Sequence, residues 1–303
     1  MSTNKRLDEI MSRMTDLGTE RVNKTLMCML YGKPGTGKTV LATGLAKYIA
    51  GGKKVLYIDT REGWVSLENH AHMVDDVVRV QYQQFSDLAL IAEAIRKGDK
   101  GFDNIGAVII DEFSTAADML LDELFREDVG ATRDEIPTEG IDARLYKPLG
   151  DACRRAVEMF QSINGLHIIL VAHERETVDH RKVKVTKPGF TPKNNDGIQK
   201  LMHVTAHVTN EIKGSGKNTT YERLVQSHPS ALVDAKSRIG GLPLQCDTAT
   251  FVQIVHDWLT DETVGLEEFE STTIASDELP DEGIPVSEEY SEDDEPVFVG
   301  ETE

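Results

Sequence analysis

The chain has few cysteines and no long hydrophobic run. Its three cysteines, Cys28, Cys153 and Cys246, are far apart in the sequence and form no metal-type pair, so we expect reduced thiols without a chemical role. No apolar segment approaches the length that crosses a bilayer, and the charged N-terminus MSTNKRLDEI lacks the apolar segment of a signal peptide. These absences predict a soluble protein of the cytoplasm without a membrane partner.

Basic residues are missing from the C-terminal end of the chain. The net charge is −19, and the segment from Gly265 onward carries fifteen Asp or Glu and no Lys or Arg, which leaves −4 for residues 1–264. The rest of the chain is therefore close to neutral, and this charge does not exclude nucleic acid as a partner. Residues 263–303 are also poor in large apolar side chains and predict a disordered acidic tail. The tail either keeps the protein soluble or competes with nucleic acid for a basic surface.

Apolar strand-like segments alternate with helical patterns across residues 25–262. Six runs predict strands: TLMCMLY, KKVLYID, DVVRV, AVIID, LHIILVAH and HVTAHVTNEI. A helix is expected from near Pro148 to Gly165, between the fourth and fifth strands. The alternation predicts an α/β fold with a mostly parallel sheet flanked by helices. In residues 1–24, apolar positions at helical spacing predict an amphipathic helix that packs on its own domain or docks on a neighbouring subunit.

The segment YGKPGTGKTV, residues 31–40, matches the phosphate-binding pattern G-x-x-x-x-G-K-[ST]. It follows an apolar strand and opens a helix, so its backbone N–H groups and the helix N-terminus are expected to bind phosphates. Lys38 is expected to reach the β- and γ-phosphates, and Thr39 to bind Mg²⁺. We predict ATP and Mg²⁺ as cofactors, with a nucleotide-binding loop made of Gly32, Lys33, Pro34, Gly35, Thr36, Gly37, Lys38, Thr39 and Val40.

Acidic and imidazole side chains follow three of the predicted strands. Asp111 ends the strand AVIID, where it can bind Mg²⁺, and Glu112 follows it as the favoured base for the attacking water. Glu62, in YIDTREG, is a second candidate base, with a plain surface role as the alternative. His173 ends the run LHIILVAH, where it could contact the γ-phosphate and report its loss, or be a mere strand-end residue.

A long polar stretch after His173 is rich in basic residues. Loops of this length are functional or disordered, and cations around an exposed aromatic ring suit single-stranded nucleic acid. A solvated basic hairpin is the alternative. The candidate nucleic-acid-binding residues are Arg181, Lys182, Lys184, Lys187, Phe190 and Lys193. Further on, Lys236 and Arg238 precede a Gly-Gly turn and could complete the active site of a neighbouring subunit, or form a surface pair.

The order of these motifs resembles the RecA-like ATPase core. The segments GKPGTGKT, YIDTREG, VIIDE, ILVAHE and AKSRIGGLP carry the resemblance, and within this group the chain is most similar to phage Sak-type single-strand annealing and recombination proteins. The resemblance implies an ATPase that binds single-stranded DNA, assembles as a ring or filament and promotes annealing or strand pairing. A single-strand-binding protein is a further implied partner, and a phage-encoded protein would act in the host cytoplasm.

The chain departs from RecA around both candidate bases. RecA carries its catalytic glutamate two residues after a strand-end aspartate, where this chain has Arg61, with Glu62 one position later. RecA also lacks an acidic residue at the position of Glu112. Three other functions stay open: a ring-forming ATPase that remodels protein or nucleoprotein complexes, a small-molecule kinase, and a module that binds ATP without hydrolysing it.

Overall fold

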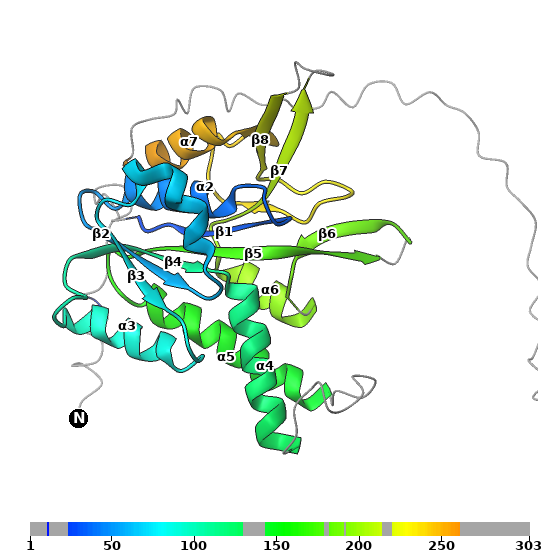
Figure 1. Ribbon diagram of the computed structural model, residues 1–303. Coiled ribbons are helices and arrows are strands. Elements are labelled where there is room, and N and C mark those ends of the chain that lie inside the picture. The colour runs from blue at the N-terminus through cyan, green and yellow to red at the C-terminus, as the bar shows by residue number, and fades with distance from the viewer. Residues whose placement is uncertain are drawn as a thin grey trace, which may run out of the picture. The chain divides into compact units, whose positions relative to one another are not determined.

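The computed structural model describes residues 11, 24–129, 143–178, 182–190, 192–213 and 220–260 (Figure 1). The chain divides into two units, residues 1–264 and 265–303, and the described residues all lie in the first. The predicted N-terminal helix lies outside the described residues except for the helical Met11, and the predicted acidic tail lies outside them as well. Among the helices of the described ranges, none is both long and apolar enough to cross a membrane.

A ten-stranded sheet forms the centre of the described fold, in the order β10-β8-β7-β1-β5-β4-β2-β3 with β6 paired to β5 and β9 to β7. Strands β1, β2, β3, β4, β5 and β7 pair in parallel, and the other pairings are antiparallel. All six predicted strands are present, and the predicted α/β fold with a mostly parallel sheet is confirmed. The strands are β1 (Met27–Gly32), β2 (Lys54–Asp59), β3 (Val77–Gln81), β4 (Ile105–Asp111), β5 (His167–Val178), β6 (Lys184–Pro188), β7 (Val204–Lys213), β8 (Thr220–Gln226), β9 (Lys236–Ser237) and β10 (Gln245–Asp247).

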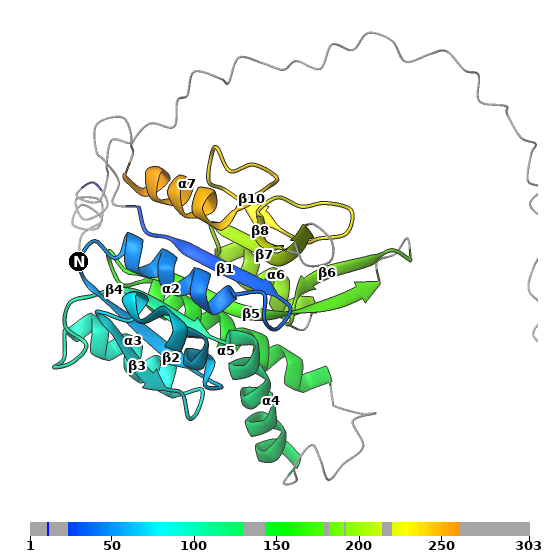
Figure 2. The same cartoon turned by 45° about the horizontal axis from the view of Figure 1, so that its top comes forward.

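Helices cover both faces of the sheet (Figures 1 and 2). One face carries α2 (Lys38–Ile49), the 3-10 helix η1 (Gly63–Met73) and α7 (Thr248–Thr260). The other face carries α3 (Asp87–Lys97), α4 (Phe113–Val129), α5 (Ala143–Gln161) and α6 (Pro192–Leu201). Parallel strands with two covered faces require apolar side chains on both sides, and this explains why the strand sequences are continuous apolar runs.

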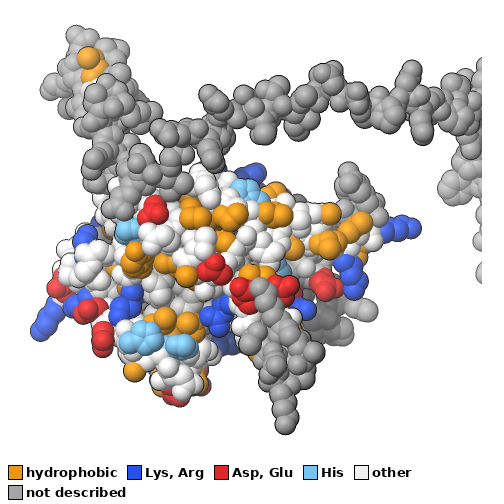
Figure 3. Space-filling view, turned by 90° about the horizontal axis from the view of Figure 1, so that it is seen from above, with side chains coloured by type: hydrophobic (Ala, Val, Ile, Leu, Met, Phe, Trp, Pro, Cys, Tyr) orange, Lys and Arg blue, Asp and Glu red, His pale blue; other side chains and the backbone are white. Residues whose placement is uncertain are grey.

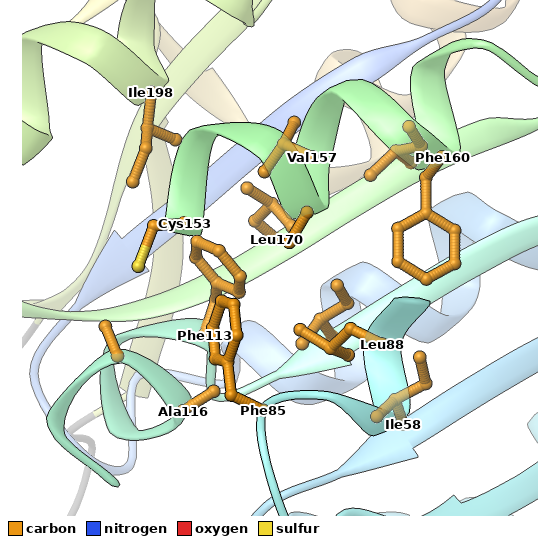
Figure 4. Packing of buried hydrophobic residues seen from close by; sticks show 14 of the residues in the cluster. Ile58, Phe85, Leu88, Phe113, Ala116, Cys153, Val157, Phe160, Leu170 and Ile198 are labelled. Atoms are coloured by element: carbon orange, nitrogen blue, oxygen red, sulfur yellow. The ribbon is translucent and has the colours of Figure 1, made fainter. Parts of the chain in front are cut away.

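The central strand β1 divides its side chains between two cores. Met29 and Tyr31 belong to the core under α3, α4 and α5, whereas Cys28 and Leu30 belong to the core under α2 and α7. Phe113 is fully buried in the first core, within the cluster of Figure 4. All three cysteines are free, as predicted. Burial raises the pKa of Cys153 to about 12, so this thiol stays protonated at neutral pH.

Two element boundaries differ from the prediction. Helix α5 begins at Ala143, so Pro148 lies inside it, where the proline removes one backbone N–H from the hydrogen-bond ladder of a long amphipathic helix. Strand β5 does not end at His173 but continues to Val178, because residues beyond His173 pair with β6. The polar stretch after His173 is therefore an antiparallel ribbon, β5–β6, followed by α6, and not an irregular loop.

Candidate nucleotide-binding site

The phosphate-binding loop lies between the C-terminal end of β1 and the first turn of α2. Gly37 precedes the helix with φ of 83°, in the left-handed region that glycine adopts without strain. Gly32 is needed for a different reason, because a Cβ there would lie 2.3 Å from the carbonyl oxygen of Val208 on β7. The loop lines a cleft of about 480 Å³ at this end of the sheet.

Lys38 is buried at the base of this loop. Its Nζ donates hydrogen bonds to the carbonyl oxygens of Gly32 at 3.0 Å and Lys33 at 2.8 Å. Burial lowers the pKa of the ammonium, while the carboxylates of Glu112 and Asp111 oppose this shift. The lysine is thus held inside the loop, where phosphate oxygens can replace the two carbonyl partners.

Thr39 and Asp111 come together as predicted for a Mg²⁺ site. Asp111 ends β4 and is 2% exposed, and its Oδ2 accepts hydrogen bonds from Thr39 Oγ1 at 2.7 Å and from the Tyr57 hydroxyl at 2.6 Å. Burial raises the pKa of Asp111, and the two hydrogen bonds oppose that rise. A hydroxyl and a carboxylate are hard oxygen donors, and Mg²⁺ is held in proteins by one or two such groups together with phosphates. These residues therefore fit Mg²⁺ bound with a nucleotide.

Glu112 lies in the same cleft and contacts His173. The carboxylate contacts His173 Nε2, and both residues line the cleft. Thr60 fixes the backbone here, because its Oγ1 accepts the Glu112 N–H at 2.6 Å and donates to the Asp111 carbonyl oxygen at 3.0 Å. His173 is held through its own N–H, which donates to Ser114 Oγ at 3.1 Å. The Glu112 carboxylate thus lies in the cleft where nucleotide phosphates are expected to bind, with His173 as its partner.

Glu62 lies outside the cleft. Asp59 at the end of β2 accepts the Gly63 N–H at 2.9 Å and forms an ion pair with Arg79 at 2.6 Å, which tightens the turn into η1. Glu62 occupies this turn with φ of 55° and is exposed, whereas its neighbours Arg61 and Gly63 line the cleft. The geometry therefore favours Glu112 over Glu62 as the base.

Several residues in the cleft or next to it were not identified from the sequence. Tyr57 lies two positions before Asp59 on β2, and only knowledge of the strand order would place its hydroxyl beside Asp111. Arg223 on β8 reaches the same cleft from a strand that follows the loop by more than 180 residues. No local motif surrounds Arg223, so the sequence offered no signal for it.

Of the predicted nucleic-acid-binding residues, Lys184 and Lys187 lie on β6 of the ribbon, and the structure corrects the prediction for Phe190. Phe190 is 3% exposed and packs edge to face on Phe113 at 5.8 Å between ring centroids, so it is a core residue and not an exposed ring for base stacking. Its apolar ring belongs to the same core as Phe113. Arg181 and the side chain of Lys193 lie outside the described residues.

The described lysines of the ribbon have mixed surroundings. Lys182 is exposed at a position with φ of 60°. Lys184 pairs with Glu176 at 3.2 Å, and Lys187 lies 3.8 Å from Asp234. On the face shown in Figure 3, Lys and Arg side chains are interspersed with acidic and hydrophobic ones. Among the described residues of the ribbon, the exposed cations are thus few and partly neutralised.

Lys236 and Arg238 lie at the opposite end of the parallel strands from the phosphate-binding loop. Lys236 Nζ donates to the Gln199 carbonyl oxygen at 2.6 Å, and Arg238 donates to that of Lys200 at 3.2 Å. Both cations thus stabilise the C-terminal end of α6, where the helix dipole favours positive charge. Burial first and Arg238 second lower the pKa of Lys236. In their own chain they lie away from the cleft, so a role in nucleotide binding would require a neighbouring subunit.

Comparison with known proteins finds one family on most of this region. The sequence model of the family described as AAA domain matches residues 24–239, which is more than half of the chain and includes every residue of the cleft. No curated protein matches the chain.

Proposed function

Because the chain belongs to the AAA domain family, we propose that it is a Mg²⁺-dependent ATPase that couples hydrolysis to single-stranded DNA binding and annealing or strand pairing. The residues of the cleft supply the parts that phosphoryl transfer requires. Lys38 exchanges its two carbonyl partners for β- and γ-phosphate oxygens. Thr39 and Asp111 hold Mg²⁺, which neutralises charge on the phosphates.

Glu112 is the general base in this proposal. Its carboxylate lies in the cleft, and its backbone is fixed by Thr60, so only the side chain has to turn from His173 towards a water molecule. His173 then loses its acidic partner whenever Glu112 engages the water. The state of the nucleotide would in this way decide whether His173 of β5 keeps its contact with Glu112.

The continuity of β5 is the observation that carries the link to DNA. His173 aligns with Gly32 at the start of the phosphate-binding loop, and the next residue, Glu174, already pairs with β6 in the ribbon. Glu174 also pairs with His207 of β7 at 2.7 Å and lies 4.0 Å from Lys33 of the loop. A conformational change at His173 is therefore passed to the ribbon at the very next residue, Glu174.

The ribbon is the proposed DNA contact. Lys182 and Lys184 carry exposed ammonium groups near its far end, where β5 and β6 turn back on each other. With Phe190 buried, binding rests on phosphate contacts and not on stacking of bases on that ring. We further propose assembly into a ring or filament, with Lys236 and Arg238 facing the nucleotide of the adjacent subunit and a single-strand-binding protein as a further partner.

The test is ATP hydrolysis at fixed low salt with and without single-stranded DNA. The proposal is supported if DNA stimulates ATP hydrolysis, if this stimulation disappears in Lys38→Ala, and if it falls in the double variant Lys182→Ala with Lys184→Ala. The matched control is Lys97→Ala with Lys100→Ala, which removes two exposed lysines at the end of α3. An unchanged stimulation in the ribbon variant, or equal loss in both double variants, would remove the ribbon from the proposal.

A second function is favoured by exposed apolar side chains. Val178, Ile212 and Tyr221 are 64%, 62% and 72% exposed, and Ile212 faces Tyr221 across β7 and β8. Such side chains at the ends of ribbons suit a protein partner better than a polyanion. An ATPase that remodels protein or nucleoprotein complexes would hydrolyse ATP at the same rate with and without DNA, and this result would favour it.

A further inference from the structure

Arg223 lies directly against the phosphate-binding loop of its own chain. A Cβ added to Gly37 would lie 2.1 Å from Arg223 Cζ, so the guanidinium packs on the bare Cα of the last glycine before Lys38. Both Arg223 and Gly37 line the cleft that also contains Lys38 and Thr39. Glycine is therefore needed at position 37 for two reasons: it adopts the positive φ of the loop, and it has no Cβ to clash with Arg223.

The guanidinium has no acidic partner among the described residues. The Arg223 side chain forms no ion pair or hydrogen bond within these ranges, and its Nε is buried without a hydrogen-bond partner. The acidic side chains of the cleft already have partners, since Asp111 binds Thr39 and Tyr57, and Glu112 pairs with His173. A buried unpaired donor is costly, so its occurrence here points to a ligand that completes it.

Positive charge accumulates at this end of the cleft. Arg223 stands beside the first turn of α2, whose N-terminus is the positive end of a helix dipole, and Lys38 lies in that same turn. An anion placed between them would contact a guanidinium, an ammonium and backbone N–H groups. Guanidinium groups bind phosphate oxygens in a bidentate manner, which fits a nucleotide phosphate chain.

A second contact joins the same hairpin to the loop. Asn210 on β7 is the residue directly opposite Arg223 on β8, and its Nδ2 donates to the Gly35 carbonyl oxygen at 3.3 Å. Two side chains that face each other across β7 and β8 thus lie on the phosphate-binding loop. The hairpin is therefore in a position to respond when the loop takes up a nucleotide.

We propose that Arg223 binds the phosphate chain of the nucleotide in cis and, together with Asn210, links nucleotide occupancy to the β7–β8 hairpin. The inference rests on the proposed nucleotide binding at this site and is independent of the proposed DNA contact. The backbone of a phosphate-binding loop cradles β- and γ-phosphates, and ADP and ATP share the β-phosphate. Arg223 is therefore expected to contribute to the binding of both nucleotides.

The test compares the nucleotide affinities of Arg223→Ala, Arg223→Lys and the control Arg155→Ala, which removes an exposed arginine of α5. Dissociation constants for a fluorescent ADP and a non-hydrolysable ATP analogue are measured with Mg²⁺. Loss of a charge-assisted contact should weaken both nucleotides by about ten- to a hundredfold in Arg223→Ala. Arg223→Lys should fall between, because it keeps the charge and loses the bidentate geometry, and Arg155→Ala should bind as the unaltered protein does.

Thermal unfolding separates a ligand contact from a structural role. Removing an unpaired guanidinium beside Lys38 should leave the unfolding temperature of the nucleotide-free protein unchanged or raise it. The increase in unfolding temperature that ADP produces should become smaller, because the variant binds ADP more weakly. If Lys38→Ala abolishes nucleotide binding but Arg223→Ala leaves it unchanged or tightens it, this inference alone is overturned. Absence of nucleotide binding by the unaltered protein would overturn the proposed function with it.

Discussion

The hydroxyl of Tyr57 should set how readily the cleft takes up Mg²⁺. Asp111 is 2% exposed, and its Oδ2 accepts only two side-chain hydrogen bonds among the described residues, from Tyr57 and Thr39. The variant Tyr57→Phe removes one of them and leaves the aromatic ring in place. Since Mg²⁺ requires the charged carboxylate, we expect the variant to need more Mg²⁺ for ATP hydrolysis.

The size of this effect follows from the geometry of the hydrogen bond. At 2.6 Å from a buried carboxylate, the hydroxyl makes a charge-assisted bond worth about 1.5–3 kcal/mol to the ionised form. Its loss disfavours the ionised form by that amount, which corresponds to an increase of roughly ten- to a hundredfold in the half-saturating Mg²⁺ concentration where Asp111 is protonated.

The Mg²⁺ requirement of ATP hydrolysis should depend on pH in a definite direction. Burial raises the pKa of Asp111, and losing the Tyr57 hydroxyl raises this pKa further. The Mg²⁺ requirement should therefore increase as pH falls, and the increase should begin at a higher pH in the variant. In the nucleotide-free protein the folded state binds the extra proton, so Asp111 contributes stability at low pH that is lost as pH rises through the raised pKa.

The assay is a Mg²⁺ titration of ATP hydrolysis at several pH values. Tyr82→Phe is the matched control, because this buried tyrosine donates to the Ala116 carbonyl oxygen at 3.4 Å, away from Asp111. Equal Mg²⁺ requirements for Tyr57→Phe and Tyr82→Phe across the pH range would refute the reasoning.

Three further predictions concern the base, the core and the tail. Glu112→Gln should lower the ATPase rate by at least about a hundredfold and keep ATP binding, whereas Glu62→Gln should hydrolyse ATP normally; the reverse result in a single-turnover assay would make Glu62 the base. Phe190→Ala should reduce the free energy of unfolding by about 3–5 kcal/mol in denaturant titrations, and a normal stability with a selective loss of DNA binding would restore its predicted role. Deleting residues 265–303 should tighten DNA binding and steepen its salt dependence, and unchanged binding would leave the tail as a solubilising segment.

The motif residues of the cleft could be predicted from the sequence because each is tied to a strand end. Lys38 and Thr39 follow β1, and Asp111 ends β4, so a parallel sheet brings them to one edge. Apolar runs identified those strands, and the phosphate-binding pattern identified the loop. Local patterns were therefore sufficient for this part of the site.

The features that could not be predicted from the sequence depend on contacts between residues far apart in the chain. The basic stretch after His173 looked like a loop because polar residues alternate there without an apolar run, yet β5 and β6 pair through their backbones. Phe190 looked exposed among its basic neighbours, and its contact with Phe113 depends on how α4 packs. Arg223 reaches the cleft only because β8 lies two strands from β1 in the sheet order.

Two ribbons that continue beyond the parallel sheet meet at the phosphate-binding loop. Glu174 opens the β5–β6 ribbon next to Lys33, and Asn210 and Arg223 lie on the loop from the β7–β8 hairpin. Glu174 also pairs with His207 of β7, so the two ribbons are joined to each other as well as to the loop. A nucleotide that changes the position of Arg223 or Lys33 is therefore expected to affect both ribbons. Hydrogen exchange should slow in both β6 and β8 when the ATP analogue binds, and slowing in only one would mean that they respond separately.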